Sequence, residues 1–198
     1  MHDNFRARLI YSKRGGACFV PHIALAQIFA RSASRAGLKL DMTQGFSPRP
    51  HLSFGPELPA GVVALNEPLD IYFAQEYSDI INPMNDALPE GFTLSQVLAV
   101  PENSPSLGKS CTHAEYLLRT GFDLAELAKN FYADALILSE HCDDWLRVII
   151  AQPAQNPIGG FVKSLIRDEL LQGWQQINIV RAAVGSFDTQ EGTVKIYA

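Results

Sequence analysis

The sequence predicts an α+β protein that consists of two tandem ferredoxin-like βαββαβ units with antiparallel sheets. Two observations predict this class. Short apolar or alternating segments, which are typical of strands, are interspersed with segments of helical periodicity, and the order β-α-β-β-α-β occurs twice. Residues 101–110 lie between the two occurrences and are rich in Pro, Ser and Gly, which is typical of a linker. One large α+β domain is the alternative organisation.

The first unit is expected at residues 1–103. Alternation predicts a strand over 6–12, and the apolar residues on one face predict a helix over 22–37, whose final glycine favours a helix end. Asn82 is suited to the N-cap and Pro83 to the first helical position of a second, short helix. The other elements of this unit are expected as that short helix within 82–91 and as strands over 51–55, 69–74 and 92–100.

The second unit is expected at residues 111–198. Asp123 and Glu126 have the spacing of a capping box, which predicts a helix over 123–133. A second helix is expected over 159–171, where apolar residues recur at helical spacing. The strands of this unit are expected over 113–120, 136–140, 145–151 and 177–185, with 193–198 returning as a hairpin.

The charge of the chain is unevenly distributed. The net charge is −5, which by itself argues against a nucleic-acid partner. Residues 1–55, however, carry eight Lys and Arg residues and two Asp residues, whereas residues 56–198 carry the other eight basic residues and 19 acidic ones. This asymmetry predicts a cationic site on an acidic body. The alternative is that the basic cluster neutralises the acidic half within the molecule.

The segment QGFSPRPHLSFG, residues 44–55, is predicted to form part of that cationic site. Pro48 and Pro50 hold their own backbone and that of the residues before them in extended conformations. Arg49 and His51 should therefore project to the same side, in a loop that is ordered before an anion binds. The alternative is a stiff structural loop in which Arg49 pairs with a nearby acid.

Alternation along the neighbouring strands places further polar side chains beside this loop. Gly45 permits a turn with positive φ, which leaves Phe46 near the rim, where its ring can stack on a base. A ferredoxin-like sheet packs both helices on one face and leaves the other face open. The residues expected on the open face are Arg6, Arg8, His51, Ser53, Asp70 and Tyr72.

The segment SKRGGACFVPH, residues 12–22, is a second candidate for anion binding. Gly15 and Gly16 can turn their amides into a concave nest, and the helix that follows begins near His22 with a favourable dipole for anions. Two cationic residues, Lys13 and Arg14, precede the glycines. The spacing is neither that of a P-loop nor that of a dinucleotide fingerprint, so a plain turn is the alternative.

Several classes of site have no support in the sequence. The three cysteines, Cys18, Cys111 and Cys142, have no spacing typical of zinc or iron–sulfur ligation, so no metal is expected in this chain. No serine occurs in a nucleophile elbow. No apolar run is long enough to cross a bilayer, and the N-terminal residues lack a signal core, so a cytoplasmic protein without a membrane partner is expected.

The most distinctive motifs are concentrated in the first half. They are Lys13, Gly15, Phe19, His22, Arg31, Arg35, AGL at 36–38, QGFSPRPHLSFGPELPAGV at 44–62, ALPEG at 87–91 and SPSL at 104–107. Together they resemble the uncharacterised domain family linked to radical SAM proteins. The resemblance is weaker in the second half, where it rests on IGGFVKSLIRDELL and VRAAVG.

In that family the domain is a companion or C-terminal domain of B12-binding radical SAM proteins. The resemblance implies a radical SAM partner that contains S-adenosylmethionine and an iron–sulfur cluster, whereas no cofactor is expected in this chain, which lacks a CxxxCxxC motif. The first helix of the family usually begins Ser-His-Leu-Asp, and here the residues are Pro21-His22-Ile23-Ala24. Only His22 carries over, which makes catalysis by this chain on its own less expected.

The expected function is therefore a non-catalytic accessory module of a radical SAM enzyme system, which binds an anionic substrate, RNA above all, on its cationic first half. The expected binding residues are Arg6, Arg8, Lys13, Arg14, Gly15, Gly16, His22, Arg31, Arg35, Gln44, Phe46, Arg49 and His51. One alternative is a subunit that docks on the radical SAM chain without nucleic acid. Another is an RNA-cleaving enzyme in which His22, His51 and Lys13 form the acid–base set.

Overall fold

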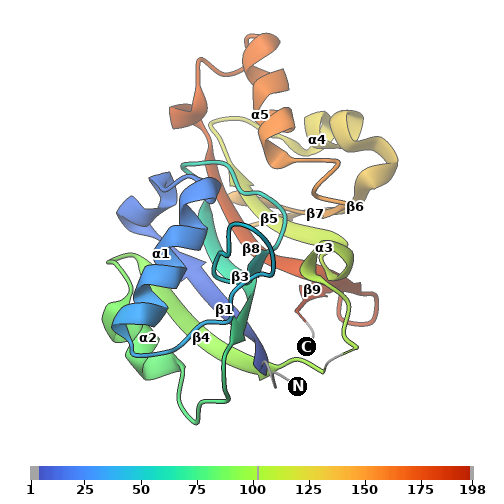
Figure 1. The fold of residues 1–198 in the computed structure, drawn as a ribbon. Coiled ribbons are helices and arrows are strands. Elements are labelled where there is room, and N and C mark those ends of the chain that lie inside the picture. Colours follow the sequence, from blue (N-terminus) through green and yellow to red (C-terminus); the bar gives the residue numbers. More distant parts are fainter. Residues whose placement is uncertain (1–4, 102, 197–198) are drawn as a thin grey trace.

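The computed structural model describes residues 5–101 and 103–196 and, within them, is an α+β structure with one nine-stranded sheet and five α-helices (Figure 1). The predicted α+β class is confirmed. The strands are β1 (Phe5–Lys13), β2 (Leu52–Phe54), β3 (Val63–Phe73), β4 (Phe92–Ala99), β5 (His113–Arg119), β6 (Leu136–Cys142), β7 (Trp145–Ala151), β8 (Asn178–Asp188) and β9 (Thr193–Lys195). The helices are α1 (His22–Arg35), α2 (Ile81–Ala87), α3 (Leu107–Ser110), α4 (Ala125–Tyr132) and α5 (Ile158–Arg167).

One sheet runs through both halves of the chain. Its strand order is β4-β1-β3-β8-β5-β7-β6, with β2 paired to β3 and β9 paired to β8. The halves meet where β3 and β8 run parallel, with Val63 opposite Val180 and Ala64 opposite Arg181. Only antiparallel sheets were predicted from the sequence, and the parallel pairing of β3 with β8 shows that this prediction was wrong at the junction. The division into domains at residues 103 and 111 stays a prediction, because a shared sheet does not decide whether either half folds alone.

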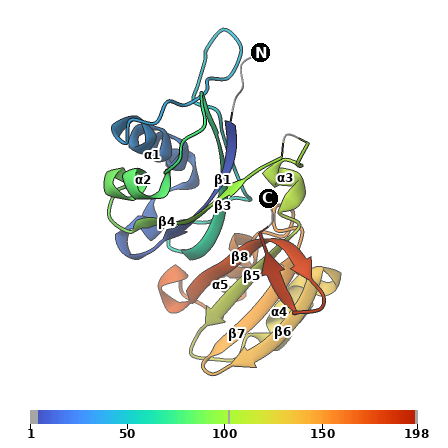
Figure 2. The same cartoon turned by 90° about the horizontal axis from the view of Figure 1, so that it is seen from below.

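Two apolar clusters pack beneath the helices. Helices α1 and α2 lie against the strands of the first half, and α4 and α5 lie against those of the second half (Figure 2). The first cluster is centred on Leu9, Leu69 and Phe29, all of them fully buried. The second contains Phe161 of α5, but it also contains Leu58, which belongs to the first half of the sequence. The loop before β3 therefore contributes to the core of the second half.

Helix α1 begins at His22, as the sequence predicts, and ends at Arg35, two residues before the predicted end at Gly37. Its apolar side buries Leu25 and Phe29. At its C-terminal end Gly37 has a φ of 74°, and Leu38 N donates to Ala33 O at 2.9 Å, which is the pattern of a Schellman motif. The glycine is needed there because a side chain at this φ would be strained.

Three segments differ from the sequence prediction. Helix α2 begins at Ile81, two residues before Pro83, the predicted first helical residue, and the Asp79 carboxylate accepts the backbone N–H of Asn82 at 3.2 Å. The supposed linker 101–110 contains α3, whose Leu107 is fully buried. Strand β3 starts at Val63 rather than at residue 69. The expected C-terminal hairpin forms between β8 and β9, and its last residues, 197–198, lie outside the described residues.

Candidate functional site

The face of the first-half sheet opposite α1 carries the polar side chains that alternation predicts. In the strand register, Arg8 of β1 and Ser53 of β2 each lie opposite Asp70 of β3. The His51 ring stacks on the Tyr72 ring, with centroids 3.7 Å apart. The shared face of these residues is thus confirmed.

That face is not open, which corrects the expectation for Arg6 and Arg8. The Asp70 carboxylate, which is fully buried, accepts from Arg8 at 2.7 and 3.0 Å and from Arg6 at 2.6 and 3.2 Å. Arg6 also donates to the carbonyl oxygens of Ser104 and Pro105 at 2.9 and 3.0 Å. Residues after β4 therefore lie across the face, and Arg8 is only 1% exposed. Its guanidinium forms an ion pair inside the protein and is not available to bind a ligand.

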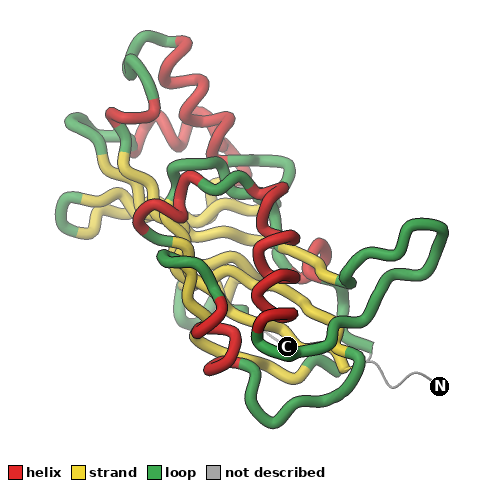
Figure 3. Tube along the Cα trace, turned by 60° about the vertical axis from the view of Figure 1, so that its left-hand side comes forward, coloured by secondary structure: helices red, strands yellow, loops and turns green. Residues whose placement is uncertain are grey.

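The proline-rich segment forms a projecting hairpin, residues 41–51, which we name the arm. Met42 and Pro50 form an isolated antiparallel bridge, and Thr43 N donates to Arg49 O at 2.8 Å. Gly45 has a φ of 133°, so the turn with positive φ is confirmed. The arm projects from the rest of the fold (Figures 2 and 3), and Phe46 near its tip is fully exposed.

The other predicted cations have different environments. Arg14, Arg31 and Arg49 are exposed, and so is Gln44 of the arm. Arg35 is also exposed, but its guanidinium donates to the carbonyl oxygen of Ala87 at 3.0 Å and so closes the end of α2. Arg31 and Arg35 lie one turn apart on α1, whereas Arg14 precedes the helix and Arg49 lies on the arm.

The start of α1 brings two predicted residues together. The Lys13 side chain is 2% exposed, and its Nζ donates to Val20 O at 3.2 Å, just before the helix. His22 is half-buried, and its ring lies 5.6 Å from that of Phe54. Burial lowers the pKa of His22 below its usual 6.5. His51 lies on the other side of the sheet, so the three acid–base candidates do not share one site.

The glycines of the predicted nest lie in a short 3₁₀ turn, Gly15–Phe19, between β1 and α1. Gly15 has a φ of 55°, and both Gly15 and Gly16 are exposed. The turn is anchored at Arg14, whose backbone N donates to Gly91 O at 2.8 Å. The backbone is thus turned as predicted, while Lys13 points inward rather than over the nest.

Sequence reasoning missed a second buried ion pair, between Arg181 of β8 and Glu67 of β3. The two nitrogens of Arg181 donate to the Glu67 carboxylate at 2.7 and 2.5 Å. Arg181 also donates to the carbonyl oxygens of Pro56 and Glu57 at 2.9 and 3.3 Å. Both charged side chains are almost completely buried. This pair joins the two halves and holds the loop before β3.

Arg181 also interacts with Tyr116 of β5, a buried residue of its own half of the chain. Burial raises the pKa of Tyr116, and its hydroxyl interacts with the Arg181 guanidinium. Burial alone would lower the pKa of Arg181, but Glu67 and Tyr116 outweigh it and raise that pKa. Arg181 therefore stays charged and links Glu67 to Tyr116.

The three free cysteines should differ sharply in reactivity. Cys142 is exposed, whereas Cys18 and Cys111 are buried. Burial raises the pKa of Cys111 to about 12 and also raises that of Cys18, so neither forms a thiolate at neutral pH. We expect Ellman's reagent to titrate one thiol in the native protein and three in urea, and none rapidly in native Cys142→Ser. Rapid reaction of a second native thiol would contradict this assignment of burial.

The fold and these contacts define an α+β protein with an exposed arm and two buried ion-pair clusters. Within residues 5–101 and 103–196, no group of three or more His, Cys, Asp or Glu side chains is placed to hold a metal ion. The helices in the same ranges are too short or too polar to span a bilayer.

Comparison with known proteins identifies the family. Residues 6–154 match the family described as "Uncharacterized protein conserved in bacteria (DUF2344)", so the chain belongs to this family. None of the curated proteins matches the chain.

Two solved structures are similar over nearly their whole length. One is an unknown protein from Galdieria sulphuraria, with 8% identity and a TM-score of 0.30, covering 92% of this chain and 98% of that one. The other is the acetolactate synthase small subunit from Thermotoga maritima, with 13% identity and a TM-score of 0.27, covering 94% and 99%. At such TM-scores neither similarity supports a statement about fold or function.

Proposed function

We propose that the chain is a non-catalytic accessory module that binds RNA through the arm and the exposed cations of its first half. The observation that supports this proposal is that several exposed cations of the first half form no ion pair within the described residues. Ion pairs within the described residues engage Arg6, Arg8, Lys129, Arg147, Arg167, Arg181 and Lys195. Arg14, Arg31, Lys39 and Arg49 are exposed and are not among them. Exposed guanidinium and ammonium groups that are not neutralised internally are what a phosphate backbone requires.

The arm supplies the second element of such a surface. Phe46 is fully exposed at its tip, and Arg49 follows three residues later on the same hairpin. The amide of Arg49 donates to Thr43 Oγ1 at 3.1 Å, which fixes the two sides of the hairpin. Single-stranded nucleic acids are held by aromatic rings that stack on bases beside cations that contact phosphates. A preformed arm lowers the cost of ordering on binding.

The same proposal assigns the chain to a radical SAM enzyme system, as the sequence resemblance implies. Each half has the element order βαββαβ, and the strand order is β4-β1-β3 with β2 beside β3 in one half and β8-β5-β7-β6 in the other. We read these as two ferredoxin-like units. An acid–base role of Lys13, His22 and His51 as one set receives no support, because His51 lies on the opposite face. A binding role is therefore favoured over RNA cleavage.

We expect the double variant Phe46→Ala/Arg49→Gln to bind single-stranded RNA about tenfold or more weakly than wild type, because a stacked base contributes about 1–3 kcal/mol. Fluorescence anisotropy with a labelled oligoribonucleotide at two salt concentrations measures both affinity and its salt dependence. Wild-type affinity should fall as salt rises. Lys163→Gln, which removes an exposed cation of α5, is the matched control and should leave the affinity unchanged.

Two results would contradict RNA binding. One is equal affinity of the double variant and wild type. The other is a co-purifying protein that persists after nuclease treatment and is lost in the double variant, with no affinity of either form for RNA. The second result would identify the arm as a surface that docks on protein.

A further inference from the structure

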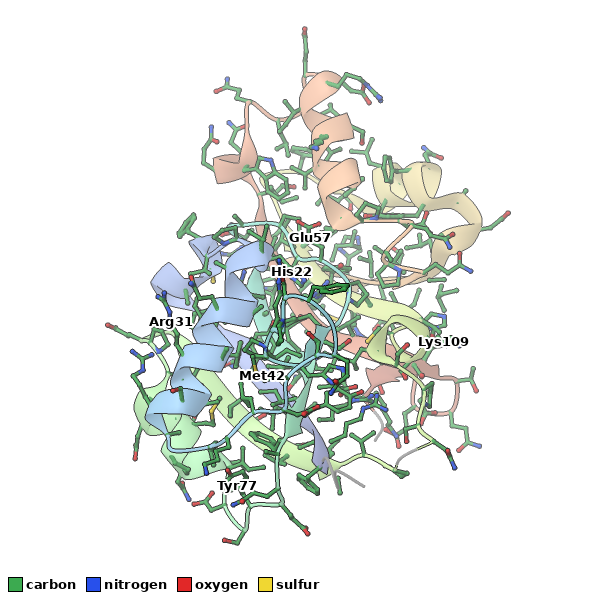
Figure 4. The ribbon with its side chains drawn as sticks, in the orientation of Figure 1. His22, Arg31, Met42, Glu57, Tyr77 and Lys109 are labelled. Atoms are coloured by element: carbon green, nitrogen blue, oxygen red, sulfur yellow. The ribbon has the colours of Figure 1, made fainter. Side chains whose placement is uncertain are left out.

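A groove of about 620 Å³ lies between the C-terminal half of α1 and the base of the arm. Ala30 and Ser34 of the helix line one part of it, and Met42 and Pro50 of the arm line another. Met42 lies beside α1 (Figure 4) and is 41% exposed. Binding pockets for small molecules occupy about 300–1,000 Å³, so the groove is large enough to hold part of a ligand.

The groove offers apolar surface and few hydrogen-bonding groups. The backbone N of Lys39 donates to the Tyr77 hydroxyl at 2.7 Å, and the carbonyl oxygen of Lys39 accepts from Ala74 N at 3.0 Å. Pro50 has no N–H to donate. Among the described residues that line the groove, only Ser34 and Lys39 have polar side chains. Reading the sequence of an RNA requires hydrogen bonds to the edges of its bases, and this lining is poorly equipped to make them.

The charge that lines the groove is positive. Lys39 is exposed, and none of the described residues that line the groove is acidic. Asp41, the acidic residue of the arm, has its carboxylate 3.6 Å from Nδ1 of His51. An apolar groove beside a cation is complementary to single-stranded RNA, in which apolar base faces alternate with phosphates. The groove also adjoins the arm, because Met42 and Pro50 are paired at the base of the hairpin.

We propose that this groove holds unpaired bases of single-stranded RNA and does not select their sequence. The inference rests on the RNA binding proposed above and specifies the form of RNA that binds. Base faces pack on the polarizable thioether of Met42 and on the ring of Pro50, and a phosphate contacts the Lys39 ammonium. A duplex is excluded from the groove, because the faces of its bases are stacked on one another.

Methyl NMR of the full chain, labelled at its methionine methyl groups, reports on the groove directly. Met84 is fully buried and serves as an internal reference, and Met42→Leu assigns the Met42 signal. Oligo(A) and oligo(U) should both shift the Met42 methyl resonance and leave that of Met84 in place. The same strands annealed to their complements, and an abasic strand of equal length, should leave Met42 unshifted. The abasic strand should also bind about tenfold or more weakly, because the stacked bases are missing.

Filling the groove tests it by affinity. Ser34 and Ala74 line the groove and are exposed, so Ser34→Leu/Ala74→Leu adds apolar bulk there without changing the charge. This variant should bind the single strand about tenfold more weakly in fluorescence anisotropy. The matched control is Ala26→Leu/Ala154→Leu, which adds the same side chains at exposed positions outside the lining, one of them also on α1. Its affinity should equal that of wild type.

The outcomes separate this inference from the RNA function on which it rests. If wild type binds RNA and the arm variant Phe46→Ala/Arg49→Gln does not, while Met42 stays unshifted and the filled variant binds normally, the groove is not a base site and the RNA function stands. An equal shift of Met42 by the abasic strand also overturns the groove. Absence of RNA binding in wild type contradicts both proposals. A Met42 shift on addition of a purified radical SAM protein, but not of RNA, would replace bases by protein as the occupant.

Discussion

Replacing Asp70 by asparagine should lower the free energy of unfolding by about 3–5 kcal/mol, because a buried charge is left without its partner. Asp70 is fully buried and is the carboxylate that holds both Arg6 and Arg8. Arg8 cannot turn to water, since its side chain is only 1% exposed. Asparagine has nearly the same shape but no charge, so the loss reports the ion pairs rather than a cavity. Urea unfolding followed by circular dichroism measures the change.

A suitable control is Glu126→Gln on α4, whose partner Lys129 is also exposed. Exposed pairs of this kind contribute little, so this variant should unfold at the wild-type urea concentration. If Asp70→Asn also unfolded there, the buried arrangement of Arg6, Arg8 and Asp70 would be wrong.

Arg181→Met should be the other strongly destabilising change, again by about 3–5 kcal/mol, because Glu67 is then left unpaired in the core. The double replacement Arg181→Met/Glu67→Leu should recover most of this loss, since two apolar side chains of similar volume replace two charges. Recovery should be incomplete, because the carbonyl oxygens of Pro56 and Glu57 lose their donor. A double-mutant cycle from urea unfolding gives the coupling between the two side chains. Strictly additive single effects would show that the pair is not formed.

Local sequence patterns predicted most of the helices and strands, but they did not predict which segments pack over the polar face of the sheet. The alternation of β1 correctly placed Arg6 and Arg8 on the face opposite α1. It did not reveal that the polar residues after β4 fold back over this face, because Ser104 and Pro105 contribute backbone carbonyls that have no sequence signature. Composition described that segment as a linker, whereas it contains helix α3, and Leu107 of that helix is buried.

The ion pair between Glu67 and Arg181 also explains why the sequence predicted a strand β3 that starts too late. The predicted strand began at residue 69, and the residues just before it read Asn-Glu-Pro, a composition typical of a turn. In the structure Glu67 is buried because Arg181, 114 residues later, neutralises it. No local pattern contains that partner. The arm, in contrast, was largely predictable, because Gly45 and the two prolines restrict their own backbone.

The position of Arg181 in the chain has a consequence for synthesis. On the ribosome, Glu67 emerges long before the strand that contains Arg181, so the first half is synthesised before this ion pair can form. Its final packing must wait until most of the polypeptide has been translated. Nascent chains that stop before β8 should therefore expose this region to chaperones and proteases, even though every helix and strand of the first half has already been synthesised.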